Sequence, residues 1–317
     1  MVYLRIDVDS FAGARDGIPR LLEVLARRGV HATFFINLGP DRWGRAIFRV
    51  LWRRGFLSKM LRTRALSSYG LATCLRGTLL PTVYIARRLG AVLREIAAAG
   101  HEVGAHCWDH VLWQDRLSRL PPSVIAEQVQ AALSAFADTF GAPAQAWAAP
   151  GWVTTPAALA HLDGRGFRYM SNSRGQSPYL PCVRQQQLRT LEIPVTLPTL
   201  DESLGRDGVE LHNYVSQLME CMEQTPVRVH TIHTETEGRG HLALFEHLLD
   251  AVAARGWKVA PLGQLAADLE VSSAPVPTCE VEYREIPGRA GIVTVQGPAV
   301  GFDQGLRAVR SFGASSA

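Results

Sequence analysis

Residues 100–110 read GHEVGAHCWDH and combine a short strand pattern with a metal-ligand spacing. His101 to Ala105 is predicted to be a strand, and His106 and His110 follow it. A turn of helix places residues four apart on one face, so the two imidazoles could bind one cation and leave coordination positions open. Ten histidines in 317 residues produce some close pairs by chance, so a surface pair is the alternative on spacing alone.

The chain on either side of this segment alternates strand and helix patterns, which is typical of a β/α protein. Many of the predicted strands end in polar residues. In a parallel β/α barrel the carboxyl ends of the strands form one rim, and the active site lies there. Further strands are predicted at 2–8, 31–37, 145–149, 167–172, 191–195, 227–233 and 258–260, and helices at 18–28, 89–98, 124–140 and 242–255.

The first predicted strand carries two carboxylates, Asp7 and Asp9, separated by one residue. Residues two apart in a strand point to the same face, and Arg5 shares that face. Two carboxylates this close need a cation between or beside them, which a metal ion or an arginine provides. One carboxylate and two histidines make a three-ligand site with open coordination, which leaves the second carboxylate free to act as a base.

A further histidine, His233, ends the strand predicted at 227–233. By strand alternation it shares a face with Thr231, opposite to His230. A lone histidine at a strand end is more often structural. Beside a metal site, however, His233 is the natural general acid, because the pKa of histidine lies near neutrality.

The composition is that of a folded globular protein, with 47% hydrophobic and 20% charged residues. The first residues form a strand with acidic side chains instead of a basic segment followed by an apolar one, so no signal peptide is predicted. No apolar run of 18 residues predicts a membrane-spanning helix. The five cysteines are scattered and odd in number, which argues against a disulfide framework or a zinc–cysteine site and fits the cytoplasm.

Residues 41–90 carry eleven basic side chains and one acidic one, although the whole chain has a net charge of +4. Large apolar residues interleave with these arginines at roughly helical spacing, as in an interfacial helix on an anionic membrane. An amphipathic helix pair packed on the domain is the alternative, and the apolar content is high for nucleic-acid binding. The residues predicted to meet the membrane are Arg42, Arg45, Arg49, Trp52, Arg53, Arg54, Phe56, Lys59, Arg62 and Arg64.

Four motifs in the right order resemble those of the NodB-homology polysaccharide deacetylases, metal-dependent amidohydrolases on a distorted (β/α)7-type barrel. RIDVD (5–9) resembles the first motif, residues 100–110 the second, AAPGW (148–152) the third and TIH (231–233) the last. The resemblance implies Asp7 as catalytic base and His233 as catalytic acid. It also implies one divalent metal ion, zinc first and manganese, cobalt or nickel as alternatives, with the ligands Asp9, His106 and His110.

The third motif departs from the usual pattern, because Ala148 stands where the family has an arginine that orients the base. The same departure occurs in one branch, the 4-deoxy-4-formamido-arabinose-phosphoundecaprenol deformylases. KMLR (59–62), SYG (68–70) and IPVTLPT (193–199) also resemble this branch. The resemblance covers about residues 2–296 and includes the basic segment, which ordinary deacetylases lack. Arg174 and Arg5 are the candidates for orienting Asp7 in place of the missing arginine.

This resemblance implies removal of a formyl group from a sugar carried on undecaprenyl phosphate, with release of formate, in the lipid A modification linked to polymyxin resistance. The implied partners are this substrate and the anionic cytoplasmic face of the inner membrane, with the protein peripheral on it and no nucleic acid bound. Two alternatives stay open. One is a deacetylase of N-acetyl sugars or peptidoglycan, and the other is a non-catalytic basic protein that binds membranes or nucleic acid.

The expected organisation is a catalytic domain over residues 1–270, with 41–90 as a basic amphipathic insertion facing the membrane. Residues 271–317 are expected to form a C-terminal extension, which is rich in Pro, Gly, Ser and Ala and partly mobile. Glu235 and Glu237 are expected to be solvated carboxylates at a strand end.

Overall fold

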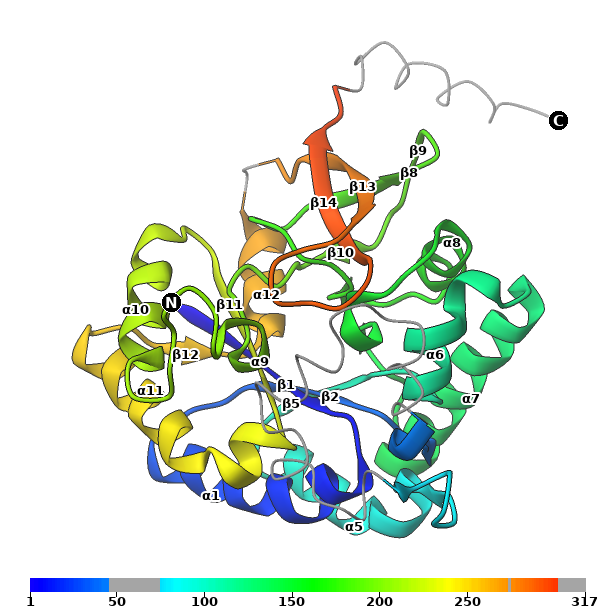
Figure 1. Ribbon diagram of the computed structural model, residues 1–317. Helices are drawn as coiled ribbons and strands as arrows, with labels where there is room; N and C mark the ends of the chain where they lie inside the picture. The colour runs from blue at the N-terminus through cyan, green and yellow to red at the C-terminus, as the bar shows by residue number, and fades with distance from the viewer. Residues whose placement is uncertain (46–74, 273–274, 302–317) are drawn as a thin grey trace, which may run out of the picture.

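The computed structural model describes residues 1–45, 75–272 and 275–301. Its main sheet consists of parallel strands in the order β10-β7-β6-β5-β2-β1-β11, with β12 paired to β1 (Figure 1). These strands are β1 (Val2–Val8), β2 (Thr33–Ile36), β5 (Glu102–Ala105), β6 (Ala146–Trp147), β7 (Tyr169–Met170), β10 (Leu191–Glu192), β11 (Arg228–His233) and β12 (Val259–Ala260).

The sheet curves so that the chain segment after β10, at one end of the strand order, meets β11 at the other end. Beyond β10, the backbone nitrogens of Thr196 and Leu197 both donate to the carbonyl of Val229 in β11, at 3.2 Å. β11 in turn pairs with β1 in parallel register, with Asp7 opposite His233. The predicted distorted (β/α)7-type barrel is therefore confirmed, although β6, β7 and β10 are each only two residues long.

Alternation along β1 separates the core from the inside of the barrel. Leu4, Ile6 and Val8 pack outward against the surrounding helices, while Tyr3 faces inward with Phe35 and Trp152. The longer helices are α1 (Ile18–Arg27), α5 (Ile85–Ala98), α7 (Pro122–Phe140), α8 (Pro156–Asp163), α10 (Tyr214–Gln224), α11 (Leu242–Ala254) and α12 (Leu262–Val271). Shorter helical segments are η1 (Gly13–Gly17), α6 (His110–Arg116), η3 (Leu117–Arg119), η4 (Pro150–Trp152), α9 (Leu200–Ser203) and η5 (Thr236–Gly240).

The C-terminal extension is built into a second, smaller sheet. Strands β13 (Thr278–Arg284) and β14 (Val293–Ala299) form an antiparallel hairpin. β13 also pairs in parallel with β8 (Leu180–Val183), which pairs with β9 (Gln186–Gln187). Residues 278–299 of the expected extension are therefore part of the folded structure, and residues 302–317 lie outside the described residues.

The predicted membrane-facing insertion is described only at its two ends, where β3 (Pro40–Asp41) pairs with β4 (Val83–Tyr84). Its predicted amphipathic helices fall on residues 46–74, outside the described residues. In the part of the chain that is described, no helix is both long and apolar enough to cross a membrane. The predicted membrane contacts outside the described residues are Arg49, Trp52, Arg53, Arg54, Phe56, Lys59, Arg62 and Arg64.

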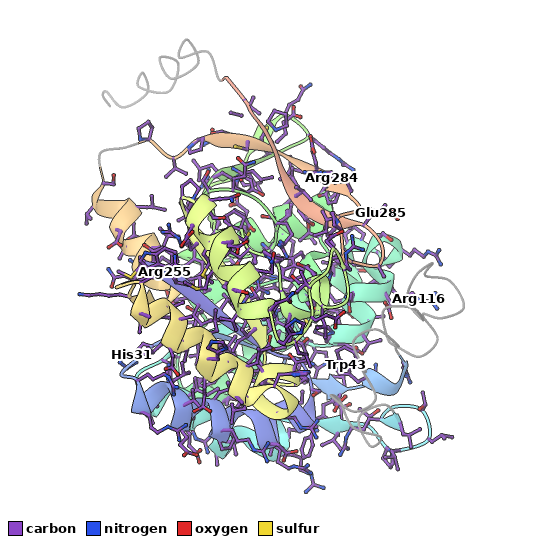
Figure 2. The ribbon with its side chains drawn as sticks, turned by 60° about the vertical axis from the view of Figure 1, so that its left-hand side comes forward. His31, Trp43, Arg116, Arg255, Arg284 and Glu285 are labelled. Atoms are coloured by element: carbon purple, nitrogen blue, oxygen red, sulfur yellow. The ribbon has the colours of Figure 1, made fainter. Side chains whose placement is uncertain are left out.

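The barrel has two ends, named here by the strand termini that meet there. His31, which precedes β2, and Arg255, which precedes β12, mark the amino end in Figure 2. Trp43, which follows β2 along the chain, lies on the opposite side, at the carboxyl end. Asp7 lies one residue before the end of β1, His233 ends β11, and the predicted metal ligands follow β1 and β5, so these residues gather at the carboxyl end.

Candidate metal centre and active site

Arg5 and Asp7 form a fully buried ion pair inside the barrel. The guanidinium of Arg5 donates from Nε and from Nη2 to the two carboxylate oxygens of Asp7, each at 2.7 Å. Its remaining nitrogen donates to the backbone carbonyl of Ser171 at 2.6 Å. Burial by itself would raise the pKa of Asp7, but the charge and hydrogen bonds of Arg5, together with the charges of His106 and His233, outweigh burial and the pKa is lowered. Asp7 is therefore ionised at neutral pH and held in one orientation.

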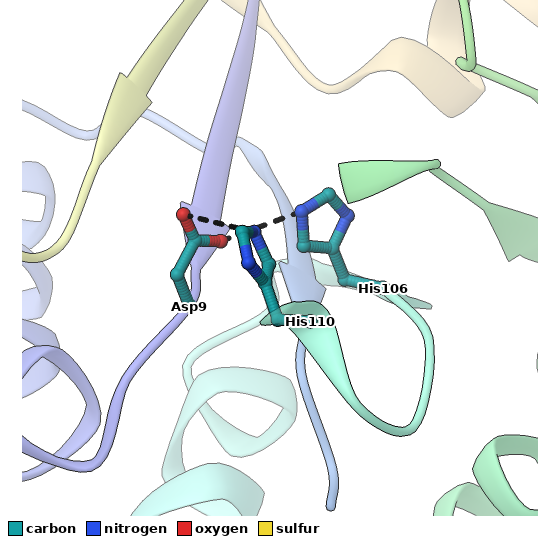
Figure 3. Close-up of side chains that lie close together, drawn as sticks. All are labelled: Asp9, His106 and His110. Carbon is teal, nitrogen blue, oxygen red and sulfur yellow. Dashed lines mark ion pairs between the residues drawn. The ribbon is translucent and has the colours of Figure 1, made fainter. Parts of the chain in front are cut away.

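Asp9, His106 and His110 form a group that can hold a metal ion, with their ligand atoms all within 4.8 Å of one another (Figure 3). The two carboxylate oxygens of Asp9 lie 3.4 Å from Nε2 of His106 and 3.3 Å from Nε2 of His110. Two ligands at about 2.0–2.1 Å from a tetrahedral ion are about 3.3 Å apart, so the spacing suits a small divalent cation.

The buried atoms of this group also lack other partners. Among the described residues, neither Oδ1 of Asp9 nor Nε2 of His106 makes a hydrogen bond, although both are buried. Nδ1 of His106 donates to the carbonyl of Ala148 at 2.9 Å, which leaves Nε2 without a proton and with its lone pair toward the site. The donor set of one carboxylate and two imidazoles therefore fits the expected metal.

The two histidines converge by a different geometry from the predicted helical turn. His106 lies in the loop after β5, and His110 is the first residue of α6. Between them Cys107 has a φ of 76°, a left-handed backbone conformation that turns the chain back toward Asp9. The prediction that both side chains meet at one site is right, but the helical explanation for it is wrong.

His110 is held by the capping of its helix. The side chain of Asp109 accepts a hydrogen bond from the backbone nitrogen of Leu112 at 3.0 Å, which fixes the first turn of α6. Arg42 donates to the other oxygen of Asp109 at 2.6 Å, and Trp43 stacks on His110 at 5.8 Å between ring centroids. Arg42, predicted to meet the membrane, thus has a partner inside the protein, and Arg45 donates to the carbonyl of Gly77.

His233 lies next to Asp7 across the β1–β11 pairing, as the predicted acid should. Its backbone nitrogen donates to the carboxylate of Glu237 at 3.0 Å. Burial by itself would lower the pKa of His233. The nearby carboxylates of Asp9, Asp201 and Asp7 outweigh burial and raise this pKa, so the protonated imidazolium is favoured.

Glu235 and Glu237 are buried, so the expectation of solvated carboxylates is wrong. Oε1 of Glu235 accepts hydrogen bonds from the backbone nitrogens of Asp9 at 3.1 Å and Ser10 at 2.8 Å. Burial and the charge of Asp9 raise the pKa of Glu235 to about 8. Glu235 therefore holds the backbone that carries Asp9. Its position two residues after His233 is the one sequence signal that could have indicated this role.

Arg174 does not contact Asp7, so the structure corrects its proposed role as the residue that orients the base. Its guanidinium donates to Glu202 at 2.7 Å and to the carbonyl of Leu197 at 2.8 Å. Of the two candidate arginines, only Arg5 contacts Asp7. Arg5 is therefore the candidate whose contacts can orient Asp7, and Ala148 contributes its backbone carbonyl to His106.

Comparison with known proteins agrees with this geometry. The family model described as polysaccharide deacetylase matches residues 1–170. A protein of Shewanella sediminis, called probable 4-deoxy-4-formamido-L-arabinose-phosphoundecaprenol deformylase ArnD, is 37% identical over 295 residues, which cover 93% of this chain and 94% of its own. A protein of Wigglesworthia glossinidia brevipalpis with the same description is 30% identical, covering 90% of this chain and 98% of its own.

The fold also matches a solved structure. The crystal structure of a putative polysaccharide deacetylase from Mycobacterium smegmatis superimposes with a TM-score of 0.59 at 19% identity. The match covers 87% of this chain and 91% of the other. At this identity the likeness concerns the fold alone, and it agrees with the distorted barrel described above.

Proposed function

The chain belongs to the polysaccharide deacetylase family, and from this premise we propose that it is a metal-dependent amidohydrolase that removes the formyl group from 4-deoxy-4-formamido-L-arabinose-phosphoundecaprenol. The main structural support for this type of reaction is the buried Arg5–Asp7 pair, which lies beside the group Asp9, His106 and His110. It supplies an oriented, ionised base next to a metal site. The substrate is the one named in the descriptions of the Shewanella and Wigglesworthia proteins.

In the proposed reaction Asp7 acts as the general base. A divalent ion held by Asp9, His106 and His110 would supply a Lewis acid for the formyl carbonyl and the attacking water. Asp7 takes a proton from the water as its oxygen bonds to the formyl carbon. Because Arg5 holds both carboxylate oxygens, Asp7 meets the water without having to reorient.

His233, the register partner of Asp7 in the β1–β11 pairing, acts as the general acid. The carbon–nitrogen bond breaks, and the imidazolium of His233 gives its proton to the departing sugar nitrogen. The products are formate and the free amino sugar, so atoms and protons balance. The raised pKa of His233 keeps this proton available at neutral pH.

For the ion itself we propose zinc, since two imidazoles and one carboxylate are a common catalytic zinc set. Manganese, cobalt and nickel accept the same donors and are the alternatives.

The proposed location is the cytoplasmic face of the inner membrane, with the protein peripheral on it. Two points support this location. The lipid of the proposed substrate lies in the bilayer, and basic residues far outnumber acidic ones within residues 41–90. The partners proposed are this lipid-linked sugar and the anionic membrane surface, without nucleic acid. The reaction would then belong to the lipid A aminoarabinose modification.

The test is release of formate from the lipid-linked formamido sugar by metal-stripped protein, restored ion by ion. The matching N-acetyl sugar serves as a second substrate. Mass spectrometry of the released acid then distinguishes deformylation from deacetylation. Formate release that depends on added metal supports the proposal. Release of acetate alone would make the protein a deacetylase, as its family model suggests. No release from either sugar, with the metal bound, would favour a non-catalytic protein.

A further inference from the structure

The connection between β13 and β14 brings an arginine to the carboxyl end of the barrel. Figure 2 shows Arg284 and Glu285, where this connection begins, on the same side of the molecule as Trp43. The turn packs tightly on α9, because a Cβ on Gly288 would lie 2.3 Å from the backbone oxygen of Glu202. Gly288 also has a φ of 80°, so glycine is needed here on both counts.

Arg289 follows this glycine, and its side chain is only 9% exposed. Its guanidinium carbon lies 4.6 Å from the centre of the Trp152 ring. Within the described part of the chain it makes a single hydrogen bond, to the carbonyl of Gly151 at 3.4 Å. Oxygens of Asp201 and Glu202 lie at 3.6 Å and 3.8 Å, which is too far for a hydrogen bond. Most of its five donors therefore have no partner of the right geometry.

Arg174 gives a direct comparison, because it lies against the same ring, at 4.9 Å. Its donors are used by Glu202 at 2.7 and 2.9 Å and by the carbonyls of Val195 and Leu197. Arg174 thus neutralises Glu202 and is itself satisfied. Arg289 carries a further positive charge beside Trp152, and its two carboxylate neighbours, Asp201 and Glu202, lie at ion-pair distance without accepting a hydrogen bond from it.

The position of Arg289 connects it to the reacting groups. The Trp152 ring that it stacks on is also contacted by Arg5, the partner of Asp7, at 5.8 Å. Asp201, the nearest carboxylate to Arg289, is one of the groups whose charge acts on His233. Arg289 is therefore connected to the base through Trp152 and Arg5, and to the acid through Asp201.

We propose that Arg289 binds the phosphodiester that joins the sugar of the substrate to its lipid. A guanidinium presents two parallel donors that match two phosphate oxygens, and a partly desolvated arginine gains most from such a partner. This inference rests on the proposed function for the identity of the substrate. It assigns the C-terminal hairpin a role in recognising substrate.

The experiment compares two soluble probes: the methyl phosphodiester of 4-deoxy-4-formamido-arabinose and its methyl glycoside, which lacks phosphate. Arg289→Gln should raise KM for the phosphodiester about tenfold to a hundredfold, with kcat changed less than about threefold. It should leave the kinetics of the glycoside unchanged. Arg289→Lys should recover part of the loss, because it restores the charge without the paired donors. The matched control, Arg174→Gln, should affect both probes by the same factor.

Three outcomes would overturn the inference: equal loss on both probes, no loss on either, or calorimetric binding of the phosphodiester no tighter than that of the glycoside in the wild-type protein. If Arg289→Gln instead weakens binding to anionic vesicles only, Arg289 contacts lipid headgroups and the inference fails. Failure of the proposed function has a different signature, which is no formate from either probe. The calorimetric comparison of wild type and Arg289→Gln still decides the role of Arg289 in that case.

Discussion

At the amino end of the barrel, Glu102 accepts several hydrogen bonds, whereas at the carboxyl end some buried polar atoms of the described residues have no partner. Oε2 of Glu102 accepts from the hydroxyl of Tyr169 at 2.8 Å, from the backbone nitrogen of Gly263 at 2.9 Å and from the hydroxyl of Thr33. Nearby, Nδ1 of His101 accepts from the backbone nitrogen of Ala32 at 3.2 Å. These polar groups join strands and helices that are far apart in the sequence.

The carboxyl end shows the opposite pattern. Among the described residues, Oδ1 of Asp9, Nε2 of His106 and Oε2 of Glu235 are buried without a hydrogen-bond partner. A buried polar atom left in this way costs about 1–3 kcal/mol of stability. One end of the barrel therefore stabilises the fold, and the other sacrifices stability to present atoms to a metal ion and a substrate.

Strand β5 spans both ends, with His101 just before it and His106 just after it. The side-chain amide of asparagine can replace Nδ1 of either histidine, since its nitrogen can donate as His106 does and its oxygen can accept as His101 does. Asparagine has no atom equivalent to Nε2. The same substitution at the two positions thus tests the contrast between the ends.

The largest effect is expected for His106→Asn. The amide can still donate to the carbonyl of Ala148, but the ligand atom Nε2 is gone. We expect loss of the bound divalent ion and a fall in kcat/KM of at least about a thousandfold, with the unfolding free energy of the metal-free protein changed by less than about 1 kcal/mol. Metal content by mass spectrometry and urea unfolding of the stripped protein check this. A variant that keeps its ion would show that His106 is not a ligand.

Asp7→Asn should lower kcat/KM by about a hundredfold to ten-thousandfold while the ion stays bound, because a general base is lost and the ligands are not. It should also lower stability by about 3 kcal/mol, because Arg5 stays buried without its carboxylate. Rates are therefore measured well below the melting temperature and expressed per folded molecule. Loss of the ion together with the activity would mean that Asp7 is a ligand instead of a base.

These two residues also show how far the sequence leads. The strand periodicity and the polar strand ends place Asp7, Asp9, His106, His110 and His233 together correctly, because parallel strands deliver their carboxyl ends to one rim. The turn at Cys107 was not predicted, because a positive φ at a residue other than glycine depends on the surrounding packing.

The burial of Glu235 and the position of Arg289 were not predicted, because both depend on contacts between segments that are distant in the sequence. Glu235 is buried because η1 packs closely on it: a Cβ on Gly13 would lie 2.0 Å from Oε1 of Glu235. Arg289 reaches the Trp152 ring because its hairpin docks through the pairing of β13 with β8, about a hundred residues earlier in the chain. Neither contact leaves a periodic signal in the sequence, since each depends on how separate elements dock.

At the amino end, Glu102→Ala should lower the unfolding free energy by about 3 kcal/mol, because Tyr169, Gly263 and Thr33 lose the oxygen to which they donate. It should leave kcat/KM per folded molecule within about twofold of wild type. Chemical denaturation and formate release, measured on the same preparation, test the two statements together. A rate loss as large as that of Asp7→Asn would contradict the separation between the two ends.

The smallest effect concerns the pH dependence of stability. Burial, with a smaller contribution from His31, lowers the pKa of His101 to about 4 from its ordinary value of 6.5. The neutral ring is thus favoured in the folded state, and the stability that it contributes is full above pH 6.5 and is lost as the pH falls toward 4. His101 keeps 7% of its surface exposed, so some solvent screening remains and we expect a loss of about 1 kcal/mol between pH 7 and pH 5. His230, whose pKa burial lowers to about 3, adds a loss of the same sign.

His101→Asn keeps an acceptor for the nitrogen of Ala32 and removes the titrating group. The free energy of unfolding, measured with urea from pH 7 to pH 5, should therefore decline less steeply in this variant. Some decline should remain, because His230 still titrates. An unchanged decline in this variant would show that His101 is protonated as easily in the folded chain as in the unfolded one.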